Sequence, residues 1–471
     1  MHAKSSRSRA GEHRSWTVLI LLSVAQFMVI LDVTVVNVAL PSIGKALAFR
    51  TADLQWVVTA YVLFTGGLLL LGGRAADILG RRSVFLVGLG MFTAASLASG
   101  LAPSPRALIV SRAAQGLGAA LLTPGALSTI TATYRGPQRT TALAAWGAIG
   151  GAGSAAGQVL GGVLTTVFGW RAIFFINVPV GIAVALLALR LVPADPRRWT
   201  GRRQLDLPGA LSVVAGLVLL VYAIEGTGAH GWTSAHTLVA LALAAGLLAA
   251  FALIERRVPR PLVPPATWRA RTLASGVALM FSVTGLLVGT FFLNSLYLQR
   301  VLGASALETG LAFLPITLVL GGAAHVASRL LARVGSRALA GAGVGLIGAG
   351  AALLSLAPHH ASYATELLPG FLLLGCGVGL AFPAASVTTM HEVEHQDAGV
   401  ASGLMTTGHE IGAALGVATF SAIATSGTGS FAAGYDNSFL VAAIVAAALA
   451  VIALVTVPAV RPSSEARLAV H

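Results

Sequence analysis

Residues 54–82 read LQWVVTAYVLFTGGLLLLGGRAADILGRR. The first twenty of them, 54–73, carry no charge, and a helix of that length spans roughly 30 Å, the thickness of a bilayer's hydrocarbon core. The segment then ends in a short loop with three arginines and one aspartate. We therefore expect the fold to be built from helices that cross a membrane and turn back through short, often basic loops.

The composition extends this interpretation to all 471 residues. Hydrophobic residues make up 56% of the chain and charged residues 10%, and the mean hydropathy is +0.85. An ordinary soluble domain has about 25% charged residues, so this chain cannot cover its surface with polar groups and needs lipid as its solvent. The single cysteine, Cys376, lies in an apolar block. It leaves no internal disulfide and no cysteine cluster for a metal, and we expect no cofactor.

Apolar blocks of about twenty residues recur along the chain and predict an all-α membrane protein with about fourteen transmembrane helices. The predicted spans are 17–39, 54–73, 83–102, 106–128, 140–164, 172–189, 207–225, 237–254, 272–297, 309–328, 338–356, 366–389, 401–424 and 439–459. The seventh and eighth form a hairpin inserted between two sets of six.

This pattern divides the chain into two six-helix bundles and a connecting part. The expected parts are a basic N-terminal segment 1–16, an N-terminal bundle 17–190, a linker with the inserted hairpin 191–271, a C-terminal bundle 272–459 and a tail 460–471. The basic N-terminal segment is similar to the start of a signal peptide. The apolar stretch behind it is longer than a cleavable one, so we expect it to remain as the first span.

The basic residues indicate which way the chain faces. Twenty-four of the 30 Lys and Arg residues fall in one set of alternate loops and the termini, five fall in the other set, and Arg112 lies within a span. Because basic residues accumulate in cytoplasmic loops, both termini are expected on the cytoplasmic side of a bacterial inner membrane. The net charge of +14 then reflects membrane topology and not nucleic acid binding.

A weak internal repeat relates the two bundles. The loop after the second span contains Gly73, Asp77, Gly80, Arg81 and Arg82. The same spacing after the tenth span gives Ser328, Ala332, Gly335, Ser336 and Arg337. The second glycine and the last arginine match. Two related halves favour a transporter whose site lies between them.

Five motifs spread over most of the chain carry a resemblance to a known family. They are LDVTVVNVALP at 31–41, LQWVVTAY at 54–61, GRAADILGRR at 73–82, RAAQGLGAA at 112–120 and WRAIFFINVPVG at 170–181. Together they identify a chain that resembles the major facilitator superfamily, specifically its fourteen-span drug:proton antiporter branch. The resemblance implies the major facilitator fold and proton-coupled export of small amphipathic or cationic drugs by alternating access.

The resemblance also implies roles for motif residues. The cytoplasmic gate motif would comprise Gly73, Asp77, Gly80, Arg81 and Arg82, and the fourth-helix motif Arg112, Gln115 and Gly116. In the fifth helix the family usually has a Gly-Pro pair, whereas here Gly157 is followed by Gln158. The remaining glycines, Gly153, Gly157, Gly161 and Gly162, include three at four-residue spacing, which lets another helix pack closely.

Ionisable residues inside spans are the candidates for proton coupling, because an unpaired charge there is costly. Asp32 and Arg112 lie roughly 10 Å from the same end of antiparallel spans, and in the family both helices border the central cavity. We expect them to pair, with Asp32 binding the transported proton; the alternative is a structural ion pair that never titrates. Glu410 is a second candidate, as a proton carrier or a counter-charge for cationic drugs.

Aromatic and amide side chains are candidates for the substrate cavity, through stacking and hydrogen bonds. They are Gln26, Trp56, Tyr61, Trp146, Asn294 and Tyr297, together with Gln115. The alternative for the Trp and Tyr residues is a role as anchors at the membrane interface. The expected partners are a small-molecule substrate, protons and lipid, and we expect a monomer.

Sequence motifs of other classes of protein are weaker in this chain. His391-Glu392-Val393-Glu394-His395 matches H-E-x-x-H, a zinc protease motif, but it falls in a predicted loop and no third-ligand segment accompanies it. An intramembrane metalloprotease thus remains only a remote alternative, and we expect neither a metal nor an enzyme. Neither of the two lysines lies in a phosphate-binding G-x-x-x-x-G-K-[ST] loop, so we expect no ATP. Export of an endogenous antibiotic, amino acid or sugar is the nearer alternative.

Overall fold

The fold is that of a computed structural model. It describes residues 2–51, 53–134, 136–192, 205–259, 261–263, 270–357, 362–393, 398–426 and 431–461. Within these ranges the chain is helical and contains no strand.

The helices follow one another with short connections. They are α1 (His2–Ala46), the 3₁₀ turn η1 (Asp53–Gln55), α2 (Trp56–Leu79), α3 (Arg81–Gly100), α4 (Pro105–Thr133), α5 (Gly136–Phe168), α6 (Ala172–Phe175), α7 (Asn177–Leu191), α8 (Leu207–His230), α9 (Ala235–Arg257), α10 (Arg271–Arg300), α11 (Ala306–Ala312), α12 (Leu314–Ser355), the π-helical turn η3 (Tyr363–Leu367), α13 (Leu368–Met390), α14 (Ala398–Thr425) and α15 (Phe431–Thr456). In the described part of the chain, ten helical segments are long and apolar enough to cross a membrane.

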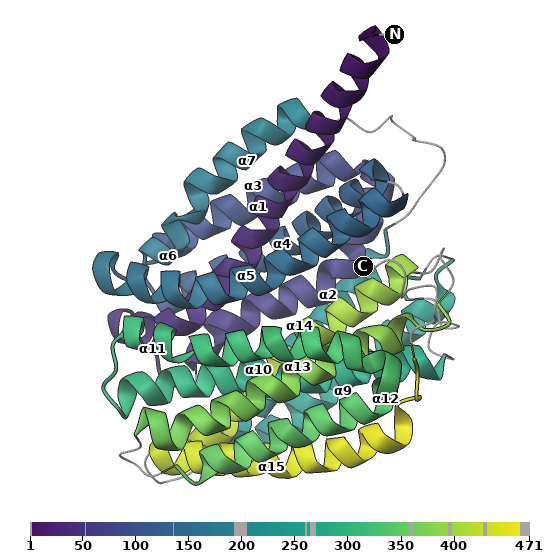
Figure 1. Cartoon of the computed structure of the whole chain (residues 1–471). Helices are drawn as coiled ribbons and strands as arrows, with labels where there is room; N and C mark the ends of the chain where they lie inside the picture. The colour runs from purple at the N-terminus through teal and green to yellow at the C-terminus, as the bar shows by residue number, and fades with distance from the viewer. Residues whose placement is uncertain are drawn as a thin grey trace.

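The helices form two groups (Figure 1). Helices α1 to α7 lie together in the upper part of the view, and α10 to α15 in the lower part. Across the boundary, α2 packs on α14 and α5 packs on α11. The hairpin of α8 and α9 is not peripheral, because α8 packs against both α2 and α14. It therefore covers a seam between the two groups.

The internal repeat is visible in backbone geometry. Gly80, between α2 and α3, has φ 96°, and Gly335, inside α12, has φ 81°. Such left-handed conformations suit glycine, which has no Cβ. In the first group Arg82 donates to the carbonyl of Leu189 at 2.6 Å, and in the second Arg337 donates to that of Val457 at 2.8 Å. Each half thus ties the same turn to the end of its last helix.

The predicted sixth span, 172–189, is interrupted between α6 and α7. Pro179 explains the position of the break, because a proline lacks an N–H and its ring clashes with the carbonyl four residues earlier, that of Phe175. Helix α6 ends at Phe175 and α7 begins at Asn177. The break places Asn177 and the carbonyl of Phe174 close to α1 and α3.

The two groups are closed against each other at one end of the bundle, which we call the Gly44 end. There the Ser295 hydroxyl donates to the carbonyl of Asn37 at 2.6 Å and the Gln299 amide to that of Val38 at 2.8 Å. Gly162 of α5 packs so tightly on α11 that an added Cβ would lie 2.8 Å from the Ala306 oxygen.

The opposite end, which carries Asp77, is called the Asp77 end. Helices α5 and α12 diverge toward it in Figure 1. At Gly147 and Gly151 of α5, and at Gly321 and Gly322 of α12, a Cβ would meet nothing within 4 Å. The two groups are therefore in contact at the Gly44 end and apart, between these helices, toward the Asp77 end.

Candidate functional site

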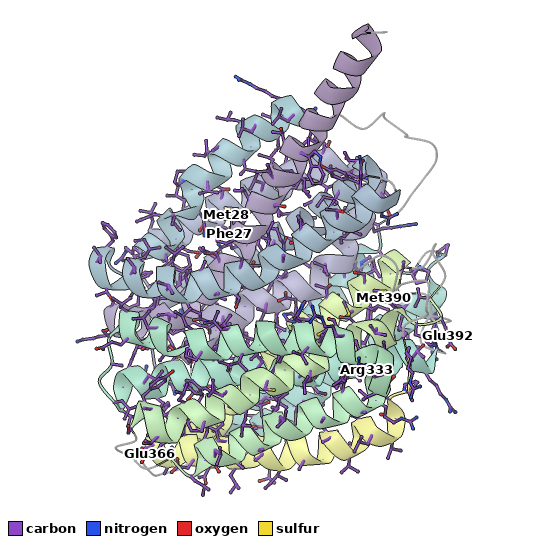
Figure 2. The ribbon with its side chains drawn as sticks, in the orientation of Figure 1. Phe27, Met28, Arg333, Glu366, Met390 and Glu392 are labelled. Carbon is purple, nitrogen blue, oxygen red and sulfur yellow. The ribbon has the colours of Figure 1, made fainter. Side chains whose placement is uncertain are left out.

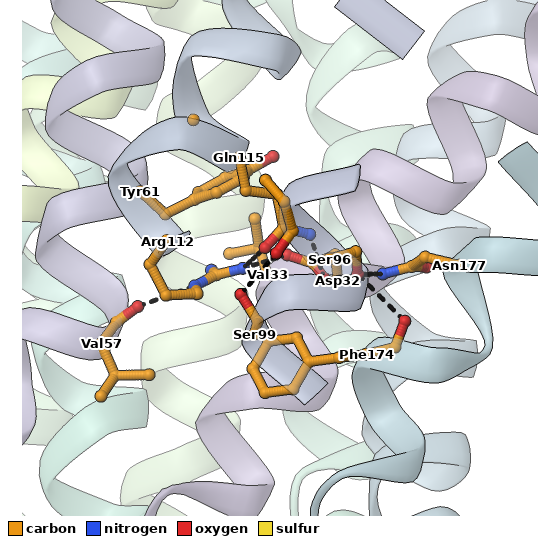
Figure 3. Close-up of polar contacts among 12 residues, drawn as sticks. Asp32, Val33, Val57, Tyr61, Ser96, Ser99, Arg112, Gln115, Phe174 and Asn177 are labelled. Carbon is orange, nitrogen blue, oxygen red and sulfur yellow. Dashed lines mark hydrogen bonds and ion pairs between the residues drawn. The ribbon is translucent and has the colours of Figure 1, made fainter. Parts of the chain in front are cut away.

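A buried ion pair between α1 and α4 lies at the centre of the first group (Figure 3). The Arg112 NH1 atom is 2.5 Å from Asp32 Oδ2, and the two side chains are 1% and 0% exposed. The pair expected from the sequence is therefore present. Because burying two charges is costly unless their remaining atoms are also bonded, the neighbours of the pair matter as much as the pair itself.

Two amides complete the shell around Asp32. The Nε2 of Gln115 and the Nδ2 of Asn177 each donate to Asp32 Oδ1 at 2.8 Å. The Oε1 of Gln115 accepts from Arg112 NH1 at 2.6 Å, and Ser96 accepts from Asn177 at 3.0 Å. Only donors face the carboxylate. An ionised carboxylate only accepts hydrogen bonds, so this arrangement suits Asp32 in its charged form.

Helix α2 holds the guanidinium of Arg112 from the other side. Its Nε donates to the carbonyl of Val57 at 2.9 Å, and its Cζ lies 4.4 Å from the centroid of the Tyr61 ring, a cation–π distance. Gly116 permits this approach: a Cβ there would lie 2.3 Å from the Tyr61 carbonyl oxygen. The fourth-helix motif thus combines the charge, its amide partner and the glycine that brings α2 close.

The fifth-helix glycines face α1, the helix that carries Asp32. An added Cβ would lie 3.2 Å from Ile30 at Gly153, 1.7 Å from the Thr34 hydroxyl at Gly157 and 2.8 Å from Val35 at Gly161. Gly162 faces the other way, toward α11. Helix α5 therefore touches the site helix on one side and the second group on the other.

Glu410 lies across the seam, on α14. A Cβ on Gly66 of α2 would lie 2.5 Å from the Glu410 Cβ, and the Thr407 hydroxyl donates to the Gly66 carbonyl at 3.3 Å. Tyr61 lies five residues before Gly66 on α2, is 1% exposed, and has its ring centroid 4.4 Å from Arg112 Cζ. Its hydroxyl has no hydrogen-bond partner among the described residues. Helix α2 therefore contacts Arg112 through Tyr61 and approaches Glu410 through Gly66.

The candidate cavity residues are dispersed. Gln26 accepts from Thr123 at 3.2 Å, and Trp146 is partly buried in the first group. Trp56 donates its indole N–H to Glu225 of α8. Asn294 accepts from Tyr435 at 2.8 Å, and Tyr297 stacks on Tyr435 at 4.1 Å between centroids. Asn294 and Tyr297 are thus buried, with Tyr435 of α15 packed against both.

The gate motif lies in the turn from α2 to α3. Gly73 of α2 faces Pro124 of α4 at ordinary contact distance, Gly80 makes the turn, and Arg81 is half-buried. Asp77 is exposed and forms no hydrogen bond or ion pair with any part of the chain that the structure describes. The carboxylate of the cytoplasmic gate motif, which could accept hydrogen bonds to hold this end closed as a latch, is therefore disengaged here, at the end where α5 and α12 diverge.

The described part of the H-E-x-x-H sequence, residues 391–393, is not helical. Helix α13 ends at Met390, and Glu392 has φ 62°; Figure 2 shows Met390 and Glu392 at the edge of the bundle. Glu394 and His395 lie outside the described residues. In the described ranges no group of three or more His, Cys, Asp or Glu side chains could hold a metal ion.

Similarity to known proteins identifies the family, which the geometry of the site alone does not. The sequence profile described as Major Facilitator Superfamily matches residues 22–417. The chain belongs to this superfamily. It is therefore a multi-pass membrane transporter and not an enzyme.

Three curated relatives are 37% to 41% identical to the chain. The chain is 40% identical over 444 residues to the puromycin resistance protein pur8 of Streptomyces alboniger, covering 92% of this chain and 87% of the relative. It is 41% identical over 447 residues to the cephamycin export protein CmcT of Amycolatopsis lactamdurans, covering 93% and 91%. It is 37% identical over 473 residues to the lincomycin resistance protein of Streptomyces lincolnensis, covering 96% and 95%.

Solved structures share the superfamily fold. A bacterial homologue of the human lysosomal transporter Spinster, in an inward-facing conformation, matches with TM-score 0.67 and 19% identity over 96% of this chain and 99% of that chain. A POT family transporter in complex with a thioalcohol-conjugated peptide matches with TM-score 0.70 and 14% identity over 93% and 95%. At these identities the likeness concerns the fold alone.

Three polar residues in or near the site were not predicted from the sequence. Asn177 was part of a recognised motif without being assigned to the Asp32 shell, and an amide two residues before a helix-breaking proline was its signal. Ser96 is one of many small polar residues in apolar helices and gave no signal. Glu225 was not predicted as a functional residue, although it is a carboxylate at the end of a predicted span.

Proposed function

We propose that this superfamily transporter exports small amphipathic antibiotics or drugs and that inward movement of protons drives the export. Resistance to, or export of, puromycin, cephamycin and lincomycin in the names of three relatives supports the substrate class. The observation that carries the proton-coupled part is the buried shell around Asp32, in which Arg112, Gln115 and Asn177 take up the carboxylate.

The membrane arrangement belongs to the same proposal. Ten segments qualify as spans, and Ala306–Ser355, the longest of them, is divided by Gly335 into two crossings. Helices α4, α5 and α14 supply three more, which gives fourteen. With the basic loops inside, both termini and the Asp77 end face the cytoplasm of a bacterial cell, and the two bundles are 17–190 and 272–459. One chain contains the whole Asp32 site, which favours a monomer.

In this orientation the molecule is open toward the cytoplasm, and the Asp32 shell describes the state after proton release. Arg112 and two amide donors all point at the Asp32 oxygens, and an ionised carboxylate can accept from all three. Proton uptake requires α1, α4 or α7 to move and loosen this shell. We assign that step to the state in which the Gly44 end opens, because the helices then change their mutual positions.

Glu410 is assigned a second role at the seam. It faces α2 from the opposite half, so rocking of the halves changes its surroundings directly. A carboxylate in such a place either binds a second proton or pairs with the charge of a cationic drug. Trp146 and Gln26 are partly accessible and belong to the proposed substrate lining, whereas Asn294 and Tyr297 would first have to be uncovered.

A second candidate function is export of a metabolite that the cell itself makes. The name of the relative CmcT, a cephamycin export protein, favours it. The two functions use one mechanism and differ only in the substrate, so one assay separates them.

The experiment is uptake into everted membrane vesicles that contain the protein. Puromycin, a cephamycin, lincomycin, cationic dyes, amino acids and sugars are offered with and without an uncoupler. We expect accumulation of one or more antibiotics or dyes that stops when the proton gradient collapses. Accumulation that survives the uncoupler would contradict proton coupling, and accumulation of amino acids or sugars alone would replace the substrate class.

A further inference from the structure

A polar cavity lies at the Gly44 end, where the two halves meet. Its volume is about 520 Å³, and it is lined from the first half by Ser42, Lys45 and Thr51 and from the second by Gln299, Arg300 and Ser305, among others. Drug-sized ligands occupy pockets of about 300–1,000 Å³. The cavity is therefore large enough for a whole organic ion with its waters.

The charges of this cavity are all of one sign. Lys45 and Arg300 line it, and no acidic residue does. Neither forms an ion pair with any residue in the described ranges. Two carboxylates, Asp53 and Glu308, follow lining residues in the sequence, and Glu308 accepts the backbone N–H of Ser305 at 2.7 Å. Lys45 and Arg300, both exposed, thus line one hollow without an ion-pair partner among the described residues.

Arg300 is also positioned by the opposite half. Its NH1 donates to the Thr51 hydroxyl at 3.1 Å, and its NH2 lies 3.5 Å from where a Cβ on Gly44 would be. Gly44 lies near the end of α1 and Thr51 follows that helix, while Arg300 is the last residue of α10. The guanidinium therefore crosses the boundary and is presented to the cavity as a fork of N–H donors.

From this juxtaposition we infer that the cavity is a binding site for a phosphate-type anion, held between Arg300 of one half and Lys45 of the other. Arginine binds phosphate through two parallel hydrogen bonds, and lysine adds a mobile point charge. Serine and threonine hydroxyls on the wall can donate to the remaining oxygens. The phosphate comes either from a soluble phosphate compound or from the head group of an anionic lipid.

The site has a consequence for the transport cycle. Its two cations come from different halves, so it is complete only while the Gly44 end is closed. A ligand that binds one conformation better shifts the population toward it. The anion therefore stabilises the closed Gly44 end and delays its opening. This effect is independent of which drug is exported.

The test uses the full-length protein and follows its melting temperature. In detergent, inorganic phosphate and glycerol 3-phosphate are titrated against chloride at equal ionic strength. In nanodiscs, phosphatidylglycerol is compared with phosphatidylcholine. Lys45→Gln and Arg300→Gln remove one charge each, and Arg300→Lys keeps the charge without the fork. Arg106→Gln is the matched control, because Arg106 is exposed at the start of α4 and does not line the cavity.

We expect the wild type and Arg106→Gln to be stabilised by the phosphate compounds or by phosphatidylglycerol. Lys45→Gln and Arg300→Gln should bind roughly tenfold more weakly, with Arg300→Lys in between. A response in detergent identifies a soluble phosphate, and a response in phosphatidylglycerol nanodiscs alone identifies the lipid head group. If neither arm distinguishes the wild type from both charge-removing variants, the site does not exist, whatever the result of the export assay.

Discussion

At the scale of single residues, the molecule concentrates its polar chemistry on one carboxylate. Asp32 is fully buried, and Arg112, Gln115 and Asn177 all donate to it. Arg112 and Gln115 lie one turn apart on α4 and Asn177 begins α7, so the shell also links α1, α4 and α7. Removing the charge should therefore affect both the stability of the fold and the handling of the proton.

The first prediction concerns stability. Asp32→Asn leaves Arg112 buried without a counter-charge and should lower the free energy of unfolding by about 3 kcal/mol. Adding Arg112→Gln removes the orphaned charge, so the double variant should recover most of that loss. Melting temperatures in one detergent measure both effects. Equal melting of the single variant and the wild type would show that the pair contributes little.

The second prediction concerns Asn177. Asn177→Ala removes one donor from Asp32 and should cost about 1.5–3 kcal/mol, as expected for a buried hydrogen bond to a charged group. Ser282→Ala is the control, because that serine is only partly buried on α10 and its hydroxyl donates to Ala278 of its own helix. It should change stability by less than about 0.5 kcal/mol. If the two variants have the same melting temperature, Asn177 does not stabilise the site.

The sequence could predict the ion pair but not its shell. Asp32 and Arg112 were identifiable because charges are rare in apolar helices and their depth follows from the helical rise. Uncharged Ser96 and Asn177 have many counterparts in other spans, and the contacts of Asn177 with Asp32 and Ser96 join residues far apart in the sequence. The packing of Glu410 on Gly66 depends on how the halves meet, which no local pattern contains.

At the scale of the elements, small residues decide which helices touch. Gly157 and Gly161 bring α5 onto α1, next to Asp32, and Gly116 brings α4 onto α2. Pro179 explains the break between α6 and α7, and Asn177, the first residue of α7, donates to Asp32. Predicted spans agree with helices along most of the chain. The docking of α8 on α2, through Glu225 and Trp56, was not predictable, because it depends on a contact between residues far apart in the sequence.

The third prediction tests the contact of α5 with α1. Gly157→Val introduces a side chain where even a Cβ would lie 1.7 Å from the Thr34 hydroxyl, and it should destabilise the protein by about 1–3 kcal/mol. Gly151→Ala, in open space on the same helix, is the matched control and should melt like the wild type. A tolerated valine would mean that α5 and α1 are farther apart than described.

The fourth prediction concerns the turn between α2 and α3. Asp77 is disengaged in this conformation, so Asp77→Asn should not change melting, but it should slow transport several-fold by weakening closure of the Asp77 end. Glu392→Gln, exposed at the end of α13, is the control and should transport normally. Transport rates in vesicles decide the matter. A wild-type rate for Asp77→Asn would remove the latch from the mechanism.

At the scale of the whole molecule, two related halves meet along a closed seam of α2 and α14, touch at the Gly44 end and diverge toward the Asp77 end. Sequence alone predicted two bundles and an inserted hairpin, because apolar blocks and basic loops are local features. It could not predict which end is open, since that depends on small free-energy differences between packings of the same helices. In our account, protonation of Asp32 is what changes that balance.

The most direct test is uphill transport by Asp32→Asn in proteoliposomes, with a substrate that the wild type exports. A pH gradient is imposed, and both net accumulation and substrate counterflow are measured at equal protein content. The account predicts that the variant loses accumulation against the gradient and keeps counterflow, because rocking of the halves does not itself require a titrating group. Accumulation by Asp32→Asn at the wild-type level would contradict it and would make Glu410 the next candidate.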